Sequence, residues 1–96
     1  MYKIKYVEKV KQNISEIEKN LDKIDKKLTD KILKALNERI QSLQEMPLRY
    51  PKYPHKPQFR WTAVHKHIIF YKVCDDRKIV EIHRIIHGAR DVKNLM

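Results

Sequence analysis

Four prolines between residues 47 and 58 divide this chain into two parts with different patterns. Proline has no backbone N–H and disfavours the helical conformation at the residue before it, so the segment 47–58 cannot be helical. We expect a stiff, extended connection there. Apolar residues recur three or four positions apart before this segment and alternate with other residues after it. The sequence therefore indicates an α+β protein with a single domain over residues 1–96.

The part before the prolines predicts two amphipathic helices. Apolar residues spaced three and four apart form two stripes: Val7, Val10, Ile14, Ile17, Leu21, Ile24 and Leu28, then Ile32, Leu33, Leu36, Ile40, Leu43 and Met46. The stripes break near residues 25–29, where Thr29 or Asp30 is a credible N-cap for the second helix. We therefore expect a helical hairpin over about 8–46. A free coiled coil is the alternative, but the repeat covers too few heptads to favour it.

The remaining segments have the alternating pattern of half-buried strands. One of them is the segment 2–7, before the helices, where Lys3 and Lys5 form the solvated side. Three more follow the prolines, at about 59–65, 68–74 and 78–87, and a tail occupies 88–96. The order β-α-α-β-β-β predicts a helical hairpin packed on one face of a mainly antiparallel four-stranded sheet.

The same alternation predicts which side chains lie on which face of the sheet. In the last strand, Val80, Ile82 and Ile86 should pack against the helices. The uncovered face should then carry an apolar floor and a set of polar side chains. The floor consists of Ile68 and Phe70, and the polar set of Arg60, Lys72, Glu81, His83 and His87.

Charge and cysteine content indicate the kind of partner and compartment. With 22 Lys and Arg against 12 Asp and Glu, the net charge is +10, which favours a polyanion, an acidic protein or an anionic membrane surface as partner. Cys74, the single cysteine, cannot form an internal disulfide, which is typical of a reducing cytosol. The sequence has neither an apolar run long enough to span a membrane nor a signal-peptide core, so we expect a soluble intracellular protein.

Two motifs near the end of the chain resemble the RelE/ParE toxin superfamily. A strand containing the Phe70-Tyr71 pair is followed by Arg84-x-x-His87-Gly88-x-Arg90-Asp91, which is most similar to the ParE-type branch. The resemblance implies the toxin of a type II toxin–antitoxin system, a cytoplasmic bacterial protein that arrests growth and can act in plasmid stabilisation. It also implies a cognate antitoxin, which we expect to be acidic and to fold on binding. Contact with operator DNA would occur only through that antitoxin, with no membrane partner and no cofactor.

The superfamily contains two activities. ParE-type members poison DNA gyrase, whereas RelE-type members cut mRNA on the ribosome. Three residues typical of RelE-type enzymes are missing here. Ile68 stands where those enzymes have an arginine early in the second of the last three strands, and Thr62 stands where they have the second lysine of the preceding strand. Their terminal tyrosine has no counterpart. The resemblance therefore favours gyrase inhibition. The alternative is a ribosome-dependent endoribonuclease whose catalytic set would be Arg60, His83, His87 and Arg90; a degenerate member that only binds an antitoxin or operator DNA is a third possibility.

The residues predicted for the binding and toxicity surface are Arg60, Lys72, Glu81, His83, Arg84, His87 and Arg90. Arg84 and Arg90 are equally consistent with a structural role, in which they pair with Asp91 or Glu81. The histidine pairs lack a clear third ligand, so we expect no metal site. The exposed basic and aromatic segment 49–56 is a further candidate for partner contact.

Overall fold

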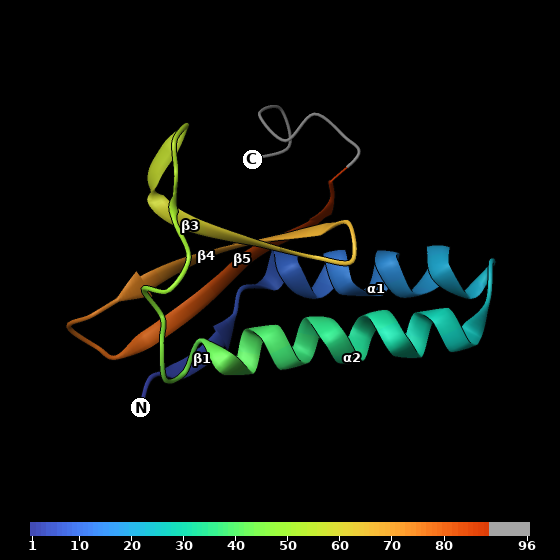
Figure 1. Ribbon diagram of the computed structural model, residues 1–96, viewed down its shortest axis with the longest axis horizontal. Coiled ribbons are helices and arrows are strands. Elements are labelled where there is room, and N and C mark those ends of the chain that lie inside the picture. The colour runs from blue at the N-terminus through green and yellow to red at the C-terminus, as the bar shows by residue number, and fades with distance from the viewer. Residues whose placement is uncertain (89–96) are drawn as a thin grey trace.

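The computed structural model describes residues 1–88, in which two helices pack on one face of a five-stranded sheet (Figure 1). The elements in chain order are β1 (Lys3–Tyr6), α1 (Glu8–Asp22), α2 (Lys26–Ser42), β2 (Lys52–Tyr53), β3 (Lys56–Val64), β4 (His67–Cys74) and β5 (Ile79–His87). The predicted α+β architecture is confirmed. The fifth strand is β2, a two-residue strand inside the proline-rich segment, where the sequence predicts only a connection.

The sheet order is β1-β5-β4-β3-β2, and every neighbouring pair is antiparallel except β1 and β5. A parallel pair needs a long crossover connection, and here the whole helical hairpin belongs to the connection between β1 and the later strands. The crossover brings the first strand of the chain beside the last one. As a result, Lys5 lies directly opposite Glu81.

The predicted helical hairpin is present with different ends. The N-cap of α2 is Asp25, whose carboxylate accepts a hydrogen bond of 3.0 Å from the backbone N–H of Lys27, and neither Thr29 nor Asp30 has this role. Ile24 and Met46 lie beyond the ends of the helices and are 73% and 58% exposed, so they do not extend the apolar stripes. Neither helix in residues 1–88 is both long enough and apolar enough to cross a membrane.

The core lies between the inner stripes of the helices and one face of the sheet. The helices contribute Val10, Ile17, Ile32, Leu36, Ile40 and Leu43, and the sheet contributes Val64, Ile69, Tyr71, Val80, Ile82 and Ile85. Removing this apolar surface from water provides the main favourable free energy of folding. The Tyr71 hydroxyl, which is buried with the ring, donates a hydrogen bond of 2.9 Å to the carbonyl of Pro47, and burial raises the pKa of Tyr71 to about 12.

A β-bulge in β5 changes which residues face the helices. Tyr71 is opposite Ile82, but the next residue along the ladder, Phe70, is opposite Arg84, so His83 is an extra residue in β5. Beyond the bulge the alternation shifts by one position. The prediction that Ile86 packs on the helices is therefore wrong: Ile85 does so, with only 2% of its surface exposed.

The bulge gives a direct test of the fold. Replacing Ile85 with alanine should lower the free energy of unfolding by about 2–5 kcal/mol, because it leaves a cavity in the core. Ile86→Ala is the matched control and should cost about 1 kcal/mol or less, since that side chain is half-buried on the other face. Chemical denaturation of both variants measures this difference. Equal losses, or a larger loss for Ile86→Ala, would contradict the shifted alternation.

Candidate functional site

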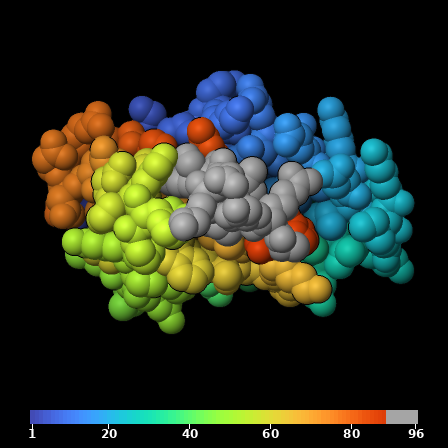
Figure 2. All heavy atoms as spheres, turned by 90° about the horizontal axis from the view of Figure 1, so that it is seen from above, coloured from blue at the N-terminus to red at the C-terminus, as the bar shows by residue number. Residues whose placement is uncertain are grey.

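The sheet face turned away from the helices carries a group of charged and aromatic side chains. Residues directly opposite each other on neighbouring strands have side chains on the same face. Glu81 is opposite both Lys5 on β1 and Lys72 on β4, and it does not belong to the core, so all three lie on this face. We call it the open face, made up of Lys3, Lys5, Phe59, Trp61, Phe70, Lys72, Glu81 and His83. Figure 2 shows the molecule from above, with the yellow-green β2–β3 region at one side and the blue α1 at the other.

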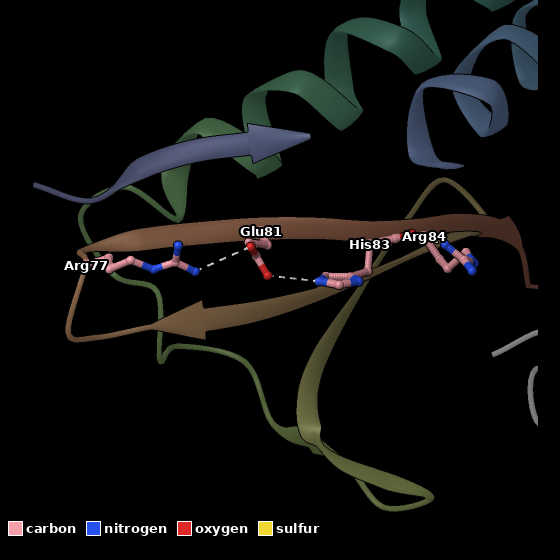
Figure 3. A network of polar contacts seen from close by, with 4 residues as sticks. All are labelled: Arg77, Glu81, His83 and Arg84. Atoms are coloured by element: carbon pink, nitrogen blue, oxygen red, sulfur yellow. Dashed lines mark hydrogen bonds and ion pairs between the residues drawn. The ribbon is translucent and has the colours of Figure 1, made fainter. Parts of the chain in front are cut away.

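Glu81 is the centre of a polar network on the open face (Figure 3). The His83 Nε2 lies 3.2 Å from Glu81 Oε1, and an Arg77 guanidinium nitrogen lies 3.9 Å from Oε2. A carboxylate can only accept, so the histidine nitrogen donates this bond. The pKa of Glu81 is lowered, chiefly by the hydrogen bond from His83 and further by the charges of His83, Lys5 and Arg77, while burial acts in the opposite direction. Glu81 is therefore ionised at neutral pH among several cations.

Aromatic rings pack beside this network. The rings of Phe59 and His83 meet edge to face with centroids 4.8 Å apart, which fixes the imidazole from the side of β3. Tyr53 on β2 packs in the same manner on Phe70, with centroids 5.0 Å apart, and both side chains are buried. The apolar floor predicted at Phe70 is thus covered in part by the short strand β2. The polar network remains at the β1–β5–β4 side of the face.

Arg60 does not lie on the open face, in contrast to the prediction. It is directly opposite Tyr71, whose ring is in the core, so its side chain leaves the sheet on the helix side. There its Nη1 donates a hydrogen bond of 2.6 Å to the carbonyl of Tyr50. The alternation in β3 separates Arg60 and Thr62 from Phe59, Trp61 and Ala63, and the register with β4 shows that the row of Arg60 and Thr62 is the one that faces the helices.

His87 is also on the helix side, because the bulge reverses the alternation between His83 and the end of β5. It is opposite His67, and the two rings meet edge to face at 5.4 Å. Both histidines line a groove of about 490 Å³ between α1 and β5, together with Asn13 and Ile17. Burial lowers the pKa of His67, whose Nδ1 donates to the carbonyl of His65 at 2.9 Å. The prediction that His87 shares a face with Glu81 and His83 is wrong.

The two remaining predicted residues are the arginines near the end of the chain. The Arg84 Nη1 donates a hydrogen bond of 2.7 Å to the carbonyl of His83, and in Figure 3 its guanidinium points away from Glu81 along β5. Arg90 lies outside the described residues. Of the predicted surface, the structure therefore brings Lys72 and His83 beside the Glu81 carboxylate, with Arg84 next to His83 at the bulge. Within residues 1–88, no three His, Cys, Asp or Glu side chains are close enough together to hold a metal ion.

Comparison with known proteins identifies the family. Residues 5–92 match the model of the family described as ParE toxin of type II toxin–antitoxin system, parDE. The chain belongs to the ParE toxin family. The match covers nearly the whole chain, and it confirms the resemblance that the sequence motifs carry.

Solved structures with the same fold include both branches of the superfamily. A chain of the chromosomal ParDE toxin–antitoxin system of P. aeruginosa aligns with a TM-score of 0.75 and 19% identity, over 91% of this chain and 96% of that one. The toxin–antitoxin complex RelBE2 of Mycobacterium tuberculosis gives 0.68 and 20%, over 90% and 96%. The isolated RelE toxin of E. coli gives 0.66 and 13%, over 99% and 93%. At these identities the similarity shows the fold alone. No curated protein matches the sequence significantly.

Sequence reasoning missed two features of this ParE-family toxin's open face. Lys3 and Lys5 were recognised as a solvated side of the first strand, but their position beside Glu81 depends on the parallel pairing of β1 with β5. Arg77 lies between the predicted strands 68–74 and 78–87 and does not belong to the predicted surface, although its guanidinium reaches Glu81 four residues later in the chain. The spacing of Arg77 and Glu81 was a weak signal, because opposite charges this close along a chain are common on protein surfaces.

The lowered pKa of Glu81 predicts a specific pH dependence of stability. A carboxyl whose folded pKa lies below its unfolded value stabilises the protein above the unfolded pKa, and this contribution is lost as the pH falls through the folded pKa. Between pH 7 and pH 3 the free energy of unfolding should therefore fall more for the wild-type toxin than for Glu81→Gln. Urea denaturation at a series of pH values measures this difference.

Glu16→Gln is the matched control, because Glu16 is exposed on α1 and makes no ion pair within residues 1–88. Its pH profile should run parallel to that of the wild type. A Glu81→Gln profile that also runs parallel to the wild type would show that the Glu81–His83 contact does not hold the carboxylate.

Proposed function

We propose that this toxin arrests bacterial growth by inhibiting DNA gyrase and that the open face is the surface that contacts the enzyme. Gyrase is the target implied by the resemblance to ParE-type toxins. One observation supports gyrase inhibition rather than mRNA cleavage: the catalytic residues predicted for a nuclease are separated. Arg60 and His87 lie on the helix side of the sheet, whereas His83 lies on the open face.

Cleavage of an RNA strand at a 2′-hydroxyl needs several groups at one phosphate. One group takes the proton of the 2′-hydroxyl, another protonates the leaving oxygen, and cations stabilise the charge that develops on the phosphoryl group. Residues on opposite sides of a sheet cannot reach the same phosphate together. Of the predicted catalytic residues that the structure describes, only His83 could contact a phosphate on the open face. This supports an inhibitor that acts by binding.

The charge distribution supports an acidic partner for the open face. Lys3, Lys5 and Lys72 are exposed around Glu81, whose single negative charge is already engaged by His83 and Arg77. Complementary charge steers association and selects partners. We therefore also propose a cognate antitoxin with an acidic segment that covers this face in the inactive complex. The RelBE2 structure is described as a toxin–antitoxin complex, which supports such a partner, and binding to operator DNA would then occur through the antitoxin.

One observation favours mRNA cleavage as the second candidate. Glu81 and His83 form a hydrogen-bonded carboxylate–imidazole pair beside cations, and a pair of this kind can transfer protons. Such an enzyme would use Glu81, His83 and Lys72, a set different from the one that the sequence suggested. Arg90 stays a proposed member of both the toxicity surface and the alternative catalytic set.

Two measurements on the same toxin separate these functions. Purified toxin should block the supercoiling of relaxed plasmid by gyrase in vitro, because the proposed target is the enzyme itself. In cells, mapping of mRNA ends after induction should reveal no new ends at fixed codon positions. Such ends together with normal supercoiling would overturn the gyrase proposal in favour of mRNA cleavage. Normal supercoiling, intact mRNA and unimpaired growth together would overturn both.

A charge substitution tests the open face as the contact surface. The double variant Lys5→Gln/Lys72→Gln should need about tenfold more toxin for half-maximal inhibition of supercoiling, since two cations are lost next to the contact. Lys19→Gln/Lys23→Gln removes the same charge from exposed positions at the end of α1 and should change the required concentration by less than about twofold. If both variants weaken inhibition equally, net charge alone matters and the open face is not the contact.

A further inference from the structure

A long part of the chain contains no acidic residue. Between Glu45 and Asp75 the sequence has neither aspartate nor glutamate, although it contains six basic residues: Arg49, Lys52, Lys56, Arg60, Lys66 and Lys72. This stretch forms the loop after α2 and the strands β2, β3 and β4. Of these six residues, Lys72 belongs to the open face, and Arg60 leaves the sheet on the opposite side.

Three arginines from different elements meet at Tyr50. The Cζ atom of Arg39 on α2 lies 5.3 Å from the centroid of the Tyr50 ring, and that of Arg49 lies 5.6 Å from it. Arg60 on β3 donates its hydrogen bond to the Tyr50 carbonyl. We call this group, Arg39, Arg49, Tyr50 and Arg60, the arginine cluster. The segment between α2 and β2, which contains Arg49 and Tyr50, passes on the left of Figure 1.

The arginine cluster is held in place without neutralising charges. Arg39 donates hydrogen bonds to the Thr62 hydroxyl and, at 3.2 Å, to the Ala63 carbonyl, so two of the guanidiniums are tied to backbone or to a buried side chain. Within residues 1–88, no carboxylate forms an ion pair with any of the three arginines. A guanidinium has five N–H donors, and these bonds occupy only a few of them. Like charges gathered in this way repel each other, and a bound anion relieves the repulsion.

The geometry of the cluster suits phosphate. Guanidiniums bind phosphate oxygens with two parallel hydrogen bonds, and an arginine already fixed on an aromatic ring or a carbonyl loses little conformational freedom on binding. Lys52 is exposed on β2 and is directly opposite Arg60, so the positive charge continues along the edge of the sheet. A row of cations fits a chain of phosphates better than a single small anion.

We propose that the arginine cluster, extended by Lys52, binds the phosphates of a nucleic-acid backbone without reading its sequence. This surface is separate from the open face, so the toxin can contact nucleic acid and a protein at the same time. The inference does not depend on gyrase as the target. It also gives a role to Arg60, which lies apart from the polar network around Glu81, and to the basic segment 49–56.

The test measures the affinity of the full-length toxin for a 30-base-pair DNA duplex and for a single-stranded RNA of 30 nucleotides, by fluorescence anisotropy at several salt concentrations. In Arg49→Gln/Arg60→Gln the affinity should fall at least about tenfold. The slope of log affinity against log salt should become shallower by about 1.8 for the duplex and about 1.4 for the single strand, if each arginine contacts one phosphate. Lys19→Gln/Lys23→Gln, with the same net charge, should stay within about twofold of wild type and keep its slope.

Several results would overturn the proposal. One is that the wild-type toxin binds neither nucleic acid at low salt. Another is that the two double variants lose affinity equally. Poly-glutamate that binds through the same residues as tightly as the nucleic acids would assign the cluster to an acidic protein instead. Circular dichroism checks the fold. If the variant with Arg60→Gln is unfolded, Arg49→Gln alone decides, with half the change in slope, because the Arg49 guanidinium packs on the Tyr50 ring and makes no hydrogen bond or ion pair within residues 1–88.

Discussion

The pairing of β4 with β5 determines which side chains this toxin presents on each side of its sheet. These strands form the centre of the sheet, and their inner residues pack on the helical hairpin. The ladder is regular except at His83, where one extra residue enters β5. Because side chains alternate between faces, this one residue moves everything beyond it to the opposite side. Ile85 becomes part of the core for this reason, and His87 joins His67 beside α1.

The two faces differ in their chemistry as a consequence. The open face has a carboxylate engaged by a histidine and an arginine and bordered by lysines, a group that combines strands from both ends of the chain. The helix side has the arginine cluster at one edge and the paired histidines at the other end of the sheet. The sheet itself thus separates two cationic regions on the surface of this small protein. An acidic protein partner and a nucleic acid could each use one of them.

Much of the fold could be predicted from the sequence because periodicity is a local property. The apolar stripe of Val10, Ile17, Leu36 and Ile40 identified both helices, and the prolines located the change to strands. The bulge could not be predicted, since either His83 or a neighbour can be the extra residue, and only the register with Phe70 and Tyr71 decides. The N-cap at Asp25 was missed because Thr29 and Asp30 are equally good capping residues by type.

The candidate site was predictable only where it depended on one strand. Glu81 and His83 are two residues apart on β5, so their common face followed from alternation. Lys5 joined them through a pairing between the first and last strands, which no local pattern reveals. Arg60 was assigned to the wrong face because the aromatic row of Phe59 and Trp61 in β3 looks like the inward one, whereas the pairing with β4 turns the polar row of Arg60 toward the helices. Family resemblance identified the toxin class, but it did not show how these residues are divided between the faces.

We propose that the open face contacts gyrase while the helical hairpin faces away. A photo-crosslinking residue at position 72, on the open face, and a second one at position 34, on the exposed side of α2, test it most directly in the presence of purified gyrase. The account predicts efficient crosslinks to a gyrase subunit from position 72 and few from position 34. Efficient crosslinks from position 34, with none from position 72, would contradict it.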